Sequence, residues 1–411
     1  MIQTQENTKI PVWTLFVYIV MIGLTFVSVP HTAIGYFVAR FIQVCELVLF
    51  VVLLFIGIRD KNMYSGFNMS VVLWWLIYTI ILYASENHDI GLTPIFNCLN
   101  IAIYLLLGTC YWSKNTIDSL KYVSIAFSIY IYLNAILVYL YPEGLWIDTE
   151  WTGRGDPTRY LFGNYNMTGF VCLLGIAVHA VYTSAVKKGK FNLFMLLIVS
   201  IATVSFLGSM TSVVALCLFA IVILFRNVIK HPKLLLLVFT ILYIISFLVI
   251  VWFGHSIEDV SWMVNFVEGT LSKDTTFSNR TDIWANAVFK IKQSLWLGFG
   301  DQGLEWNDLY LGGSGPHNLW LMLLLRGGII LLSTFIMVLF YTIRYALNCS
   351  SHFVIFAGVV ALCVLLIMSM FEVYKLVHFF VLLQIIYYSS FIEIQKNESK
   401  QMKNSEHKPI I

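Results

Sequence analysis

Apolar runs of roughly 16 to 26 residues follow one another along most of the chain, and they constrain its fold more than any other feature. A helix needs about 20 apolar residues to cross the hydrocarbon core of a bilayer. We place about twelve transmembrane helices over residues 12–29, 33–58, 69–84, 92–112, 120–141, 161–183, 191–208, 210–225, 233–253, 318–342, 352–371 and 375–392. The last two are separated near Glu372 because a single helix would be about 60 Å long, roughly twice the hydrocarbon thickness. The runs predict an all-α integral membrane protein in which residues 1–411 form a single polytopic domain.

The composition excludes several other classes of protein. Hydrophobic residues make up 59% of the 411 residues and charged residues 11%, whereas a soluble domain carries about 25% charged residues. The net charge of +3 is too small to indicate a nucleic-acid partner. All seven cysteines lie within or beside apolar runs without a CxxC pattern, so we expect packing residues and no disulfide framework. We likewise expect no metal site and no cofactor.

Lysine and arginine residues concentrate in every second loop, which indicates the orientation of the chain. With the N-terminus inside, the inner loops hold Arg59, Lys61, Lys114, Lys121, Lys187, Lys188, Lys190, Arg226, Lys230, Lys233 and Arg344. The first, third and seventh loops hold none. The positive-inside rule therefore predicts that both termini are cytoplasmic, with residues 393–411 as a cytoplasmic tail. This places a multi-pass protein in the cytoplasmic (inner) membrane.

Two long loops then fall on the outer side, at residues 142–160 and 254–317. The second is the large extracytoplasmic loop and the only long polar stretch of the chain. Apolar residues recur in it at helical spacing, at Trp284, Val288, Ile291 and Leu295. This spacing predicts an amphipathic helix from Arg280 to Ser294, lying on the outer membrane surface or on the helix bundle. Because polar residues gather on this face, we expect the functional site there.

The stretch GPHNLWLMLLLRGG places His317 and Asn318 at the start of an apolar run. At a helix start the unpaired N–H groups create a positive field that disfavours the imidazolium form. A neutral His317 can take a proton from a hydroxyl group. The same position also suits a histidine that caps the helix or forms hydrogen bonds at the membrane interface. The position alone leaves both interpretations open.

Three arginines on the outer loops are candidates for binding an anion: Arg154, Arg159 and Arg280. Guanidinium groups bind phosphate oxygens in bidentate pairs, so the three together can neutralise one phosphate group. Separately, each is also explained as a solvated loop charge or a lipid-headgroup contact. Asp148 and Glu150 form an acidic-x-acidic pattern, which is a weak indication of a metal site. The arginines are therefore the stronger candidates for handling phosphates, and we predict no metal.

Arg326 is a charged residue inside an apolar run, where charge is costly. It lies nine residues after His317, which is about 13 Å deeper and half a turn around an ideal helix. We therefore expect Arg326 to face away from His317 and to serve a structural role, with Glu46 or Glu372 as its partner.

Two glycine- and serine-rich motifs also lie near the outer side. Gly298, Gly300 and Gly303 match GxGxxG but follow a helical pattern rather than a strand, so a dinucleotide site is not expected. We expect these glycines to allow a tight return of the chain toward His317. The SMTSVV bend, residues 209–214, is explained equally well by close helix packing and by substrate contact.

Four segments, taken in order, resemble the O-antigen polymerase and O-antigen ligase superfamily of Wzy-type and WaaL-type proteins. TRYLFGNYNMTG resembles its Arg-x-x-x-Gly-Asn-x-Asn signature, and SMTSVVAL resembles its serine-containing helix start. NRTDIWANAVFKIKQSLWLGFG resembles a segment in which Arg and Ile-Trp precede a Leu-Gly-x-Gly turn. SGPHNLWLMLLLRGGIILL resembles the His-Asn motif that ends the large periplasmic loop. The resemblance covers residues 150 to 345, approximately half of the chain.

The resemblance implies metal-independent sugar transfer from a polyprenyl diphosphate donor, such as undecaprenyl diphosphate, outside the cytoplasmic membrane. It implies direct displacement, in which His317 takes the proton of the acceptor hydroxyl and Asn318 orients the ring or the sugar. Arg280 and Arg159, with Arg154, would neutralise the diphosphate leaving group. Tryptophans of the outer loops suit stacking on sugars or an interfacial aromatic belt: Trp146, Trp151, Trp284 and Trp306.

Three functions compete on this basis. The first is a polymerase that joins lipid-linked repeat units into a capsular, O-antigen or exopolysaccharide chain. The second is a ligase that moves a finished glycan to another acceptor. The third is a flippase or transporter of the same lipid-linked sugar, although the repeated halves and broken helices typical of transporters are not evident in the sequence. Expected partners are a lipid-linked oligosaccharide donor and acceptor and membrane lipids, with flippase and chain-length regulator proteins as further candidates.

Overall fold

The computed structural model describes residues 10–29, 33–84, 93–148, 157–226, 229, 232–252, 280–313, 315–348, 352–372 and 375–392. The α-helices are α1 (Trp13–Phe26), α2 (Ala33–Gly57), α3 (Gly66–Ala84), α4 (Thr93–Leu107), α5 (Thr116–Leu140), α6 (Tyr165–Val186), α7 (Lys190–Phe206), α8 (Met210–Leu224), α9 (Pro232–Ser246), α11 (Arg280–Gln293), α12 (Leu304–Leu311), α13 (Leu319–Asn348), α14 (His352–Met368) and α15 (Val377–Ser389). A short 3₁₀-helix, η1 (Lys61–Tyr64), precedes α3, and single π-helical stretches, η2 (Gly108–Trp112) and η3 (Phe247–Trp252), extend α4 and α9.

Each of the twelve predicted apolar segments contains a helix, which confirms an all-α membrane protein. Five helices are long and apolar enough to cross a membrane: Gly35–Gly57, Gly66–Tyr83, Thr116–Leu140, Tyr165–Val186 and Leu319–Asn348. The other apolar helices are shorter, such as Trp13–Phe26 and Val377–Ser389. The number of crossings and the side of the membrane on which each loop lies stay predictions.

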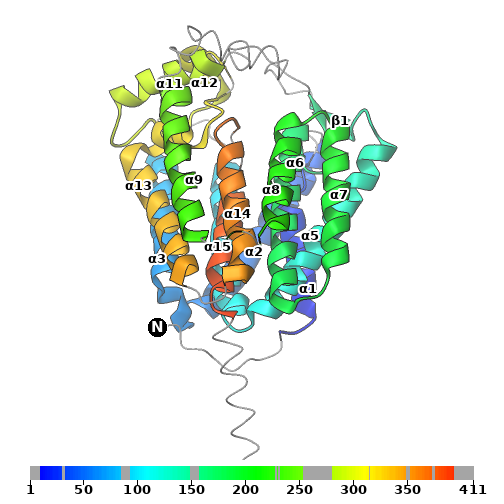
Figure 1. Ribbon diagram of the computed structural model, residues 1–411. Coiled ribbons are helices and arrows are strands. Elements are labelled where there is room, and N and C mark those ends of the chain that lie inside the picture. The colour runs from blue at the N-terminus through cyan, green and yellow to red at the C-terminus, as the bar shows by residue number, and fades with distance from the viewer. Residues whose placement is uncertain are drawn as a thin grey trace, which may run out of the picture.

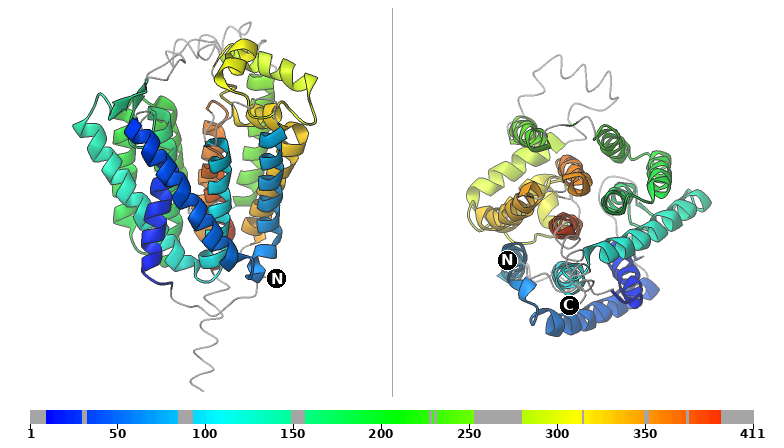
Figure 2. Two further views of the ribbon diagram at one scale, coloured as in Figure 1. Left: turned by 180° about the vertical axis from the view of Figure 1, so that it is seen from behind. Right: turned by 60° about the horizontal axis from the view of Figure 1, so that its bottom comes forward.

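The core of the bundle is formed by α14 and α15, which lie inside the ring of the other helices (Figure 2). Every residue of α15 is buried, and a helix that is apolar on all sides belongs in a core. Gln384 on α15 connects it to α4, because its Nε2 donates to the Tyr104 carbonyl at 2.6 Å. The central pair therefore provides a rigid base for the residues of the α14–α15 linker.

The lateral surface of the bundle, along the length of its helices, is apolar. Large hydrophobic side chains of α2 and α9 are exposed, among them Phe37, Phe55, Leu237 and Leu242. Large contiguous apolar patches are unusual on soluble monomers and are typical of surfaces that face lipid or a partner. This surface agrees with a bundle that has lipid as its solvent.

The predicted amphipathic helix forms as α11, which lies with α12 at one end of the bundle, opposite the start of α1 and the end of α15 (Figure 1). Trp284, Val288 and Ile291 are buried against α13, as their spacing predicts. Leu295 lies beyond the end of the helix. The indole Nε1 of Trp284 donates to the Pro316 carbonyl at 3.0 Å, which fixes α11 beside the start of α13.

The loop between α5 and α6 contains a short antiparallel pair, β1 (Trp146–Ile147) and β2 (Thr158–Arg159). Trp146 pairs with Arg159 in this register. The pair holds both residues near the start of α6, at the same end of the bundle as α11 (Figure 1).

Helix α13 is broken, whereas the sequence predicts one continuous apolar helix over 318–342. Gly327 and Gly328 have non-helical backbone angles, and Gly328 combines φ 59° with ψ −157°. This conformation is available essentially only to glycine. Residues 295–300 fill the break: the Phe299 N–H donates to the Leu325 carbonyl at 2.7 Å, and the Ile329 N–H donates to the Leu295 carbonyl at 2.9 Å. The chain's own backbone thus satisfies the polar groups that the break releases.

Candidate active site

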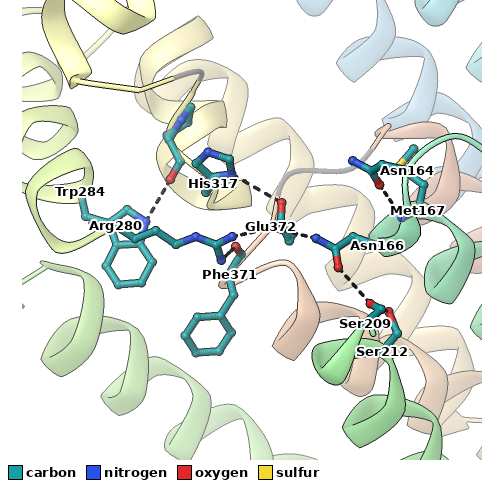
Figure 3. Close-up of polar contacts among 11 residues, drawn as sticks. Asn164, Asn166, Met167, Ser209, Ser212, Arg280, Trp284, His317, Phe371 and Glu372 are labelled. Atoms are coloured by element: carbon teal, nitrogen blue, oxygen red, sulfur yellow. Dashed lines mark hydrogen bonds and ion pairs between the residues drawn. The ribbon is translucent and has the colours of Figure 1, made fainter. Parts of the chain in front are cut away.

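Glu372 is the centre of a polar cluster at the end of the bundle that carries α11 and α12 (Figure 3). It lies in the linker between α14 and α15. Arg280 Nη2 donates to Glu372 Oε1 at 2.6 Å, and Asn166 Nδ2 donates to the same oxygen at 3.1 Å. His317 Nδ1 lies 3.5 Å from Glu372 Oε2. One carboxylate therefore joins α6, α11 and the start of α13.

The backbone at His317 is strained. Its φ of 44° lies in the left-handed region, which residues with a Cβ rarely adopt. Its two neighbours in the sequence are both held in place: the Pro316 carbonyl accepts a hydrogen bond from Trp284, and Asn318 is buried. Strain of this kind persists only where the surrounding structure determines the conformation, and it clusters at functional sites.

Asn318 caps the start of α13 with its side chain. Its Oδ1 accepts hydrogen bonds from the backbone N–H groups of Trp320 at 2.9 Å and Leu321 at 3.1 Å. Its Nδ2 donates to the Met370 carbonyl at 2.9 Å. With its side chain fully buried in these contacts, Asn318 fixes the backbone beside His317. The N–H groups of Trp320 and Leu321 therefore point at Asn318, and the N–H of Leu319 donates to the Ser369 carbonyl at 2.9 Å, so these three groups do not point at the imidazole.

The contact with Glu372 assigns the tautomer of His317. A carboxylate oxygen accepts hydrogen bonds, so the proton of a neutral imidazole belongs on Nδ1. The lone pair of Nε2 is then the basic position of the ring. A carboxylate that orients a histidine in this way is a common arrangement for a general base.

Glu372 stays ionised in this environment. Burial alone raises the pKa of its carboxyl group, but the hydrogen bond from His317 and the charge of Arg280 outweigh burial, and the net pKa is lowered from its ordinary value of 4.5. Arg280 also donates from Nη1 to the Phe371 carbonyl. The cluster therefore holds an ionised carboxylate beside a guanidinium and an imidazole.

The SMTSVV bend extends the cluster toward α8. Ser209 Oγ donates to Asn166 Oδ1 at 2.9 Å and lies 2.7 Å from Ser212 Oγ. A Cβ at Gly169 on α6 would overlap the Ser212 side chain. Close helix packing therefore explains this motif, and its hydroxyl groups also link α8 to Glu372 through Asn166.

Arg159 and Arg280 are paired with different carboxylates, so the structure does not bring them onto one acidic partner. Arg159 Nη2 lies 3.1 Å from Asp148 Oδ2. Arg159 and Asp148 line a cavity of about 210 Å³, together with Trp146, Asn164 and Lys375. Arg154, Glu150 and Trp151, the remaining predicted residues of this loop, lie outside the described residues.

Arg326 has neither of its predicted partners. Its Nη2 lies 2.5 Å from Asp301 Oδ1, and its Nη1 donates to the hydroxyl of Tyr78 on α3 at 2.9 Å. The predicted role of the GxGxxG motif is also wrong. Gly298 and Gly300 have positive φ, but they return the chain to the break in α13 and not to His317, because the Gly300 N–H donates to the Arg326 carbonyl at 2.9 Å.

Sequence reasoning missed the central role of Glu372, which it considered only as a partner of Arg326. The available signal is that Glu372 divides two apolar runs, where a charge is otherwise costly. Within the described ranges, no group of three His, Cys, Asp or Glu side chains can hold a metal ion. Six of the cysteines are free, and Cys349 lies outside the described residues.

Comparison with known protein families identifies the region around this cluster. Residues 191–336 match the family model of the O-antigen ligases. The matched range runs from α7 into the second half of α13 and contains Arg280, His317 and Asn318. The resemblance to the O-antigen polymerase and ligase superfamily is therefore confirmed for this part of the chain, residues 191–336. No curated protein matches the chain.

The O-antigen ligase match supports a membrane enzyme that processes glycans in the manner of a glycosyltransferase, with lipid-linked glycans as substrates. Arg159 and Glu372 lie outside the matched range. Glu372 joins the family's region through direct contacts with Arg280 and His317.

Proposed function

We propose that the protein is a metal-independent polymerase that joins undecaprenyl-diphosphate-linked oligosaccharide repeat units on the outer face of the cytoplasmic membrane. The observation that carries this proposal is the cluster of His317, Arg280 and Glu372 within and beside the O-antigen ligase match. The product would be a capsular, O-antigen or exopolysaccharide chain. The cluster combines a base with a phosphate-binding side chain, which are the two groups that the transfer needs.

In the proposed reaction, the hydroxyl oxygen of the acceptor sugar attacks the anomeric carbon of the donor sugar. The bond from that carbon to the diphosphate breaks, and the diphosphate leaves with the electron pair. His317 Nε2 takes the hydroxyl proton, and Glu372 stabilises the imidazolium that results. Arg280, with Arg159 and Arg154, neutralises the leaving group. Asn318 acts on this step only by fixing the backbone beside His317.

The experiment that tests the proposal is reconstitution of the purified protein with a lipid-diphosphate repeat unit, followed by separation of the products by size. Wild-type protein should give a ladder of polymers, and His317→Ala should slow its formation by at least about 100-fold. Arg226→Met, on the opposite side of the bundle, is the matched control. Unchanged ladders in a folded His317→Ala protein contradict the role of His317. Loss of wild-type activity in chelator contradicts metal independence.

A ligase is the second candidate, because the matching family model is that of the O-antigen ligases. The same base and arginines would then transfer a finished glycan to a different acceptor. The reconstitution separates the two functions when the acceptor is varied. A ladder formed from the lipid-linked repeat unit alone supports the polymerase. A single transfer that requires a second, chemically different acceptor supports the ligase.

A further inference from the structure

The cavity of about 210 Å³ near Arg159 lies beside the linker that carries Glu372. One side chain of this linker faces the His317 cluster, and another faces the cavity. Glu372 binds Arg280 and His317. Lys375 lines the cavity. The volume is well above the ~30 Å³ that one water molecule occupies in the liquid. The cavity is thus a polar hollow at the end of α1 and the start of α6, next to the linker that carries Glu372.

The charges around this cavity favour an anion. Arg159 and Lys375 are its cations, and Asp148 is the single carboxylate among its described lining residues. Asp148 pairs with Arg159 at 3.1 Å. Lys375 is exposed to the hollow, and its Nζ donates to the Thr25 carbonyl at 3.4 Å. Over the parts of the chain that the structure describes, no carboxylate lies within ion-pair distance of Lys375.

The backbone of Lys375 is held in place before any ligand binds. His378 Nδ1 lies 2.7 Å from the Lys375 carbonyl, and the imidazole packs against Phe26, whose side chain also lines the cavity. Arg159 is held in turn by strand pairing with Trp146. Ordering a long cation in advance lowers the entropic cost of binding. Two such cations from distant parts of the chain therefore form a prepared site.

We propose that Lys375, together with Arg159, forms a subsite for the phosphate groups of a lipid. Resting on the proposed function, the inference is that this subsite holds the diphosphate of a lipid-linked glycan, while His317 and Glu372 handle the attacking hydroxyl. Lys375, which also interacts electrostatically with Glu46, supplies an ammonium group, and Arg159 supplies planar N–H donors. The headgroup of an anionic phospholipid has the same phosphate chemistry, so the test must distinguish these two sources.

The test measures the binding of farnesyl diphosphate to the full-length protein in phosphatidylcholine nanodiscs, with farnesol as the uncharged probe. Lys375→Met should weaken the binding of farnesyl diphosphate at least about tenfold, and Lys375→Arg should restore most of it. Lys292→Met, which removes an exposed lysine on α11, should bind as wild type does. Farnesol should bind equally to all four proteins.

Lysine acylation of the wild-type protein, read by mass spectrometry, keeps the proposal testable if Lys375→Met does not fold. Farnesyl diphosphate should protect Lys375 and leave Lys292 reactive. A folded Lys375→Met protein with wild-type affinity overturns the subsite, as does unprotected Lys375. Equal protection by phosphatidylglycerol nanodiscs overturns the assignment to the substrate and indicates a headgroup site. These readouts measure binding only, so an active His317→Ala protein would overturn the proposed function and leave this result unaffected.

Discussion

Two junctions connect other parts of the chain to α13, one at its start beside Leu319 and one at the break around Gly327 and Gly328. At the break, residues 295–300 and the neighbouring backbone form paired hydrogen bonds, and Arg326 pairs with Asp301. At the start, one carboxylate, Glu372, is shared by three side chains from different elements, and His317 adopts a left-handed backbone conformation.

The difference separates a structural junction from a chemical one. Both contain an arginine and a carboxylate, so charge alone does not distinguish them. At the break, the backbone bonds and the ion pair close a gap in a helix, which is a stabilising role. At the start, strain, a shared acid and a titratable imidazole coincide, which is the combination expected where a proton is transferred. Substitutions at the break should therefore change stability, and substitutions at the start should change rate.

The largest expected effect is on stability at the break. In Gly328→Ala, the added Cβ would overlap the backbone of Trp296, in a conformation that alanine disfavours. We expect a loss of about 4 kcal/mol, since strain and a backbone clash add. Thermal unfolding in detergent measures it. Gly208→Ala is the control, because Gly208 has φ 72° with open space around it, and it should cost only about 1 kcal/mol. Equal melting of the two variants would show that the break is not rigid.

The next effect is on rate at the start of α13. Glu372→Gln keeps the shape of the side chain but removes the charge that orients His317 and would stabilise its imidazolium form. We expect sugar transfer to slow by about 100-fold with a small change in melting temperature. Initial rates at saturating substrate measure this effect. Glu305→Gln removes an exposed carboxylate of α12 and should keep the wild-type rate. A Glu372→Gln protein of wild-type activity would remove the distinction between the two junctions.

A smaller effect is expected for the ion pair at the break. Asp301→Asn leaves the partly buried Arg326 with Tyr78 but without its carboxylate. We expect a loss of about 2 kcal/mol in stability and an unchanged rate per folded molecule. A double-mutant cycle with Arg326→Gln measures the coupling by thermal unfolding. Asp308→Asn, an exposed change on α12, is the control. A large fall in rate with normal melting would place Asp301 in the chemistry instead.

Much of the fold could be predicted because helix length and apolar composition are local properties. The apolar runs and the spacing of Trp284, Val288 and Ile291 predict helices that the structure contains. The break in α13 was missed, although the adjacent glycines in RGG are a local signal for it. Its cause is tertiary, because residues 295–300 must be present to satisfy the released backbone groups.

The contacts of the site could not be predicted in the same way. Glu372 lies 55 residues from His317 and 92 residues from Arg280 along the chain. Only the packing of α14 against the rest of the bundle brings these groups together. Arg326 shows the same limit, because the helical geometry that turns it from His317 does not identify Asp301 as its partner. Candidate residue types can thus be read from a sequence more easily than their pairs.

The smallest expected effect is a difference in acid stability between wild type and Glu372→Gln. In the folded state burial raises the pKa of Glu372, but the hydrogen bond from His317 and the charge of Arg280 outweigh burial and lower the pKa below 4.5. The carboxylate therefore contributes stability above pH 4.5, and this contribution is lost as pH falls through the lowered folded-state pKa. Melting temperatures between pH 7 and about 3 should converge for the two proteins at the acid end. Glu305→Gln should show no such convergence, because its carboxylate is exposed. A difference in melting temperature between wild type and Glu372→Gln that stays constant with pH would mean that the charge of Glu372 does not stabilise the junction. The role of Glu372 would then be to orient His317 alone.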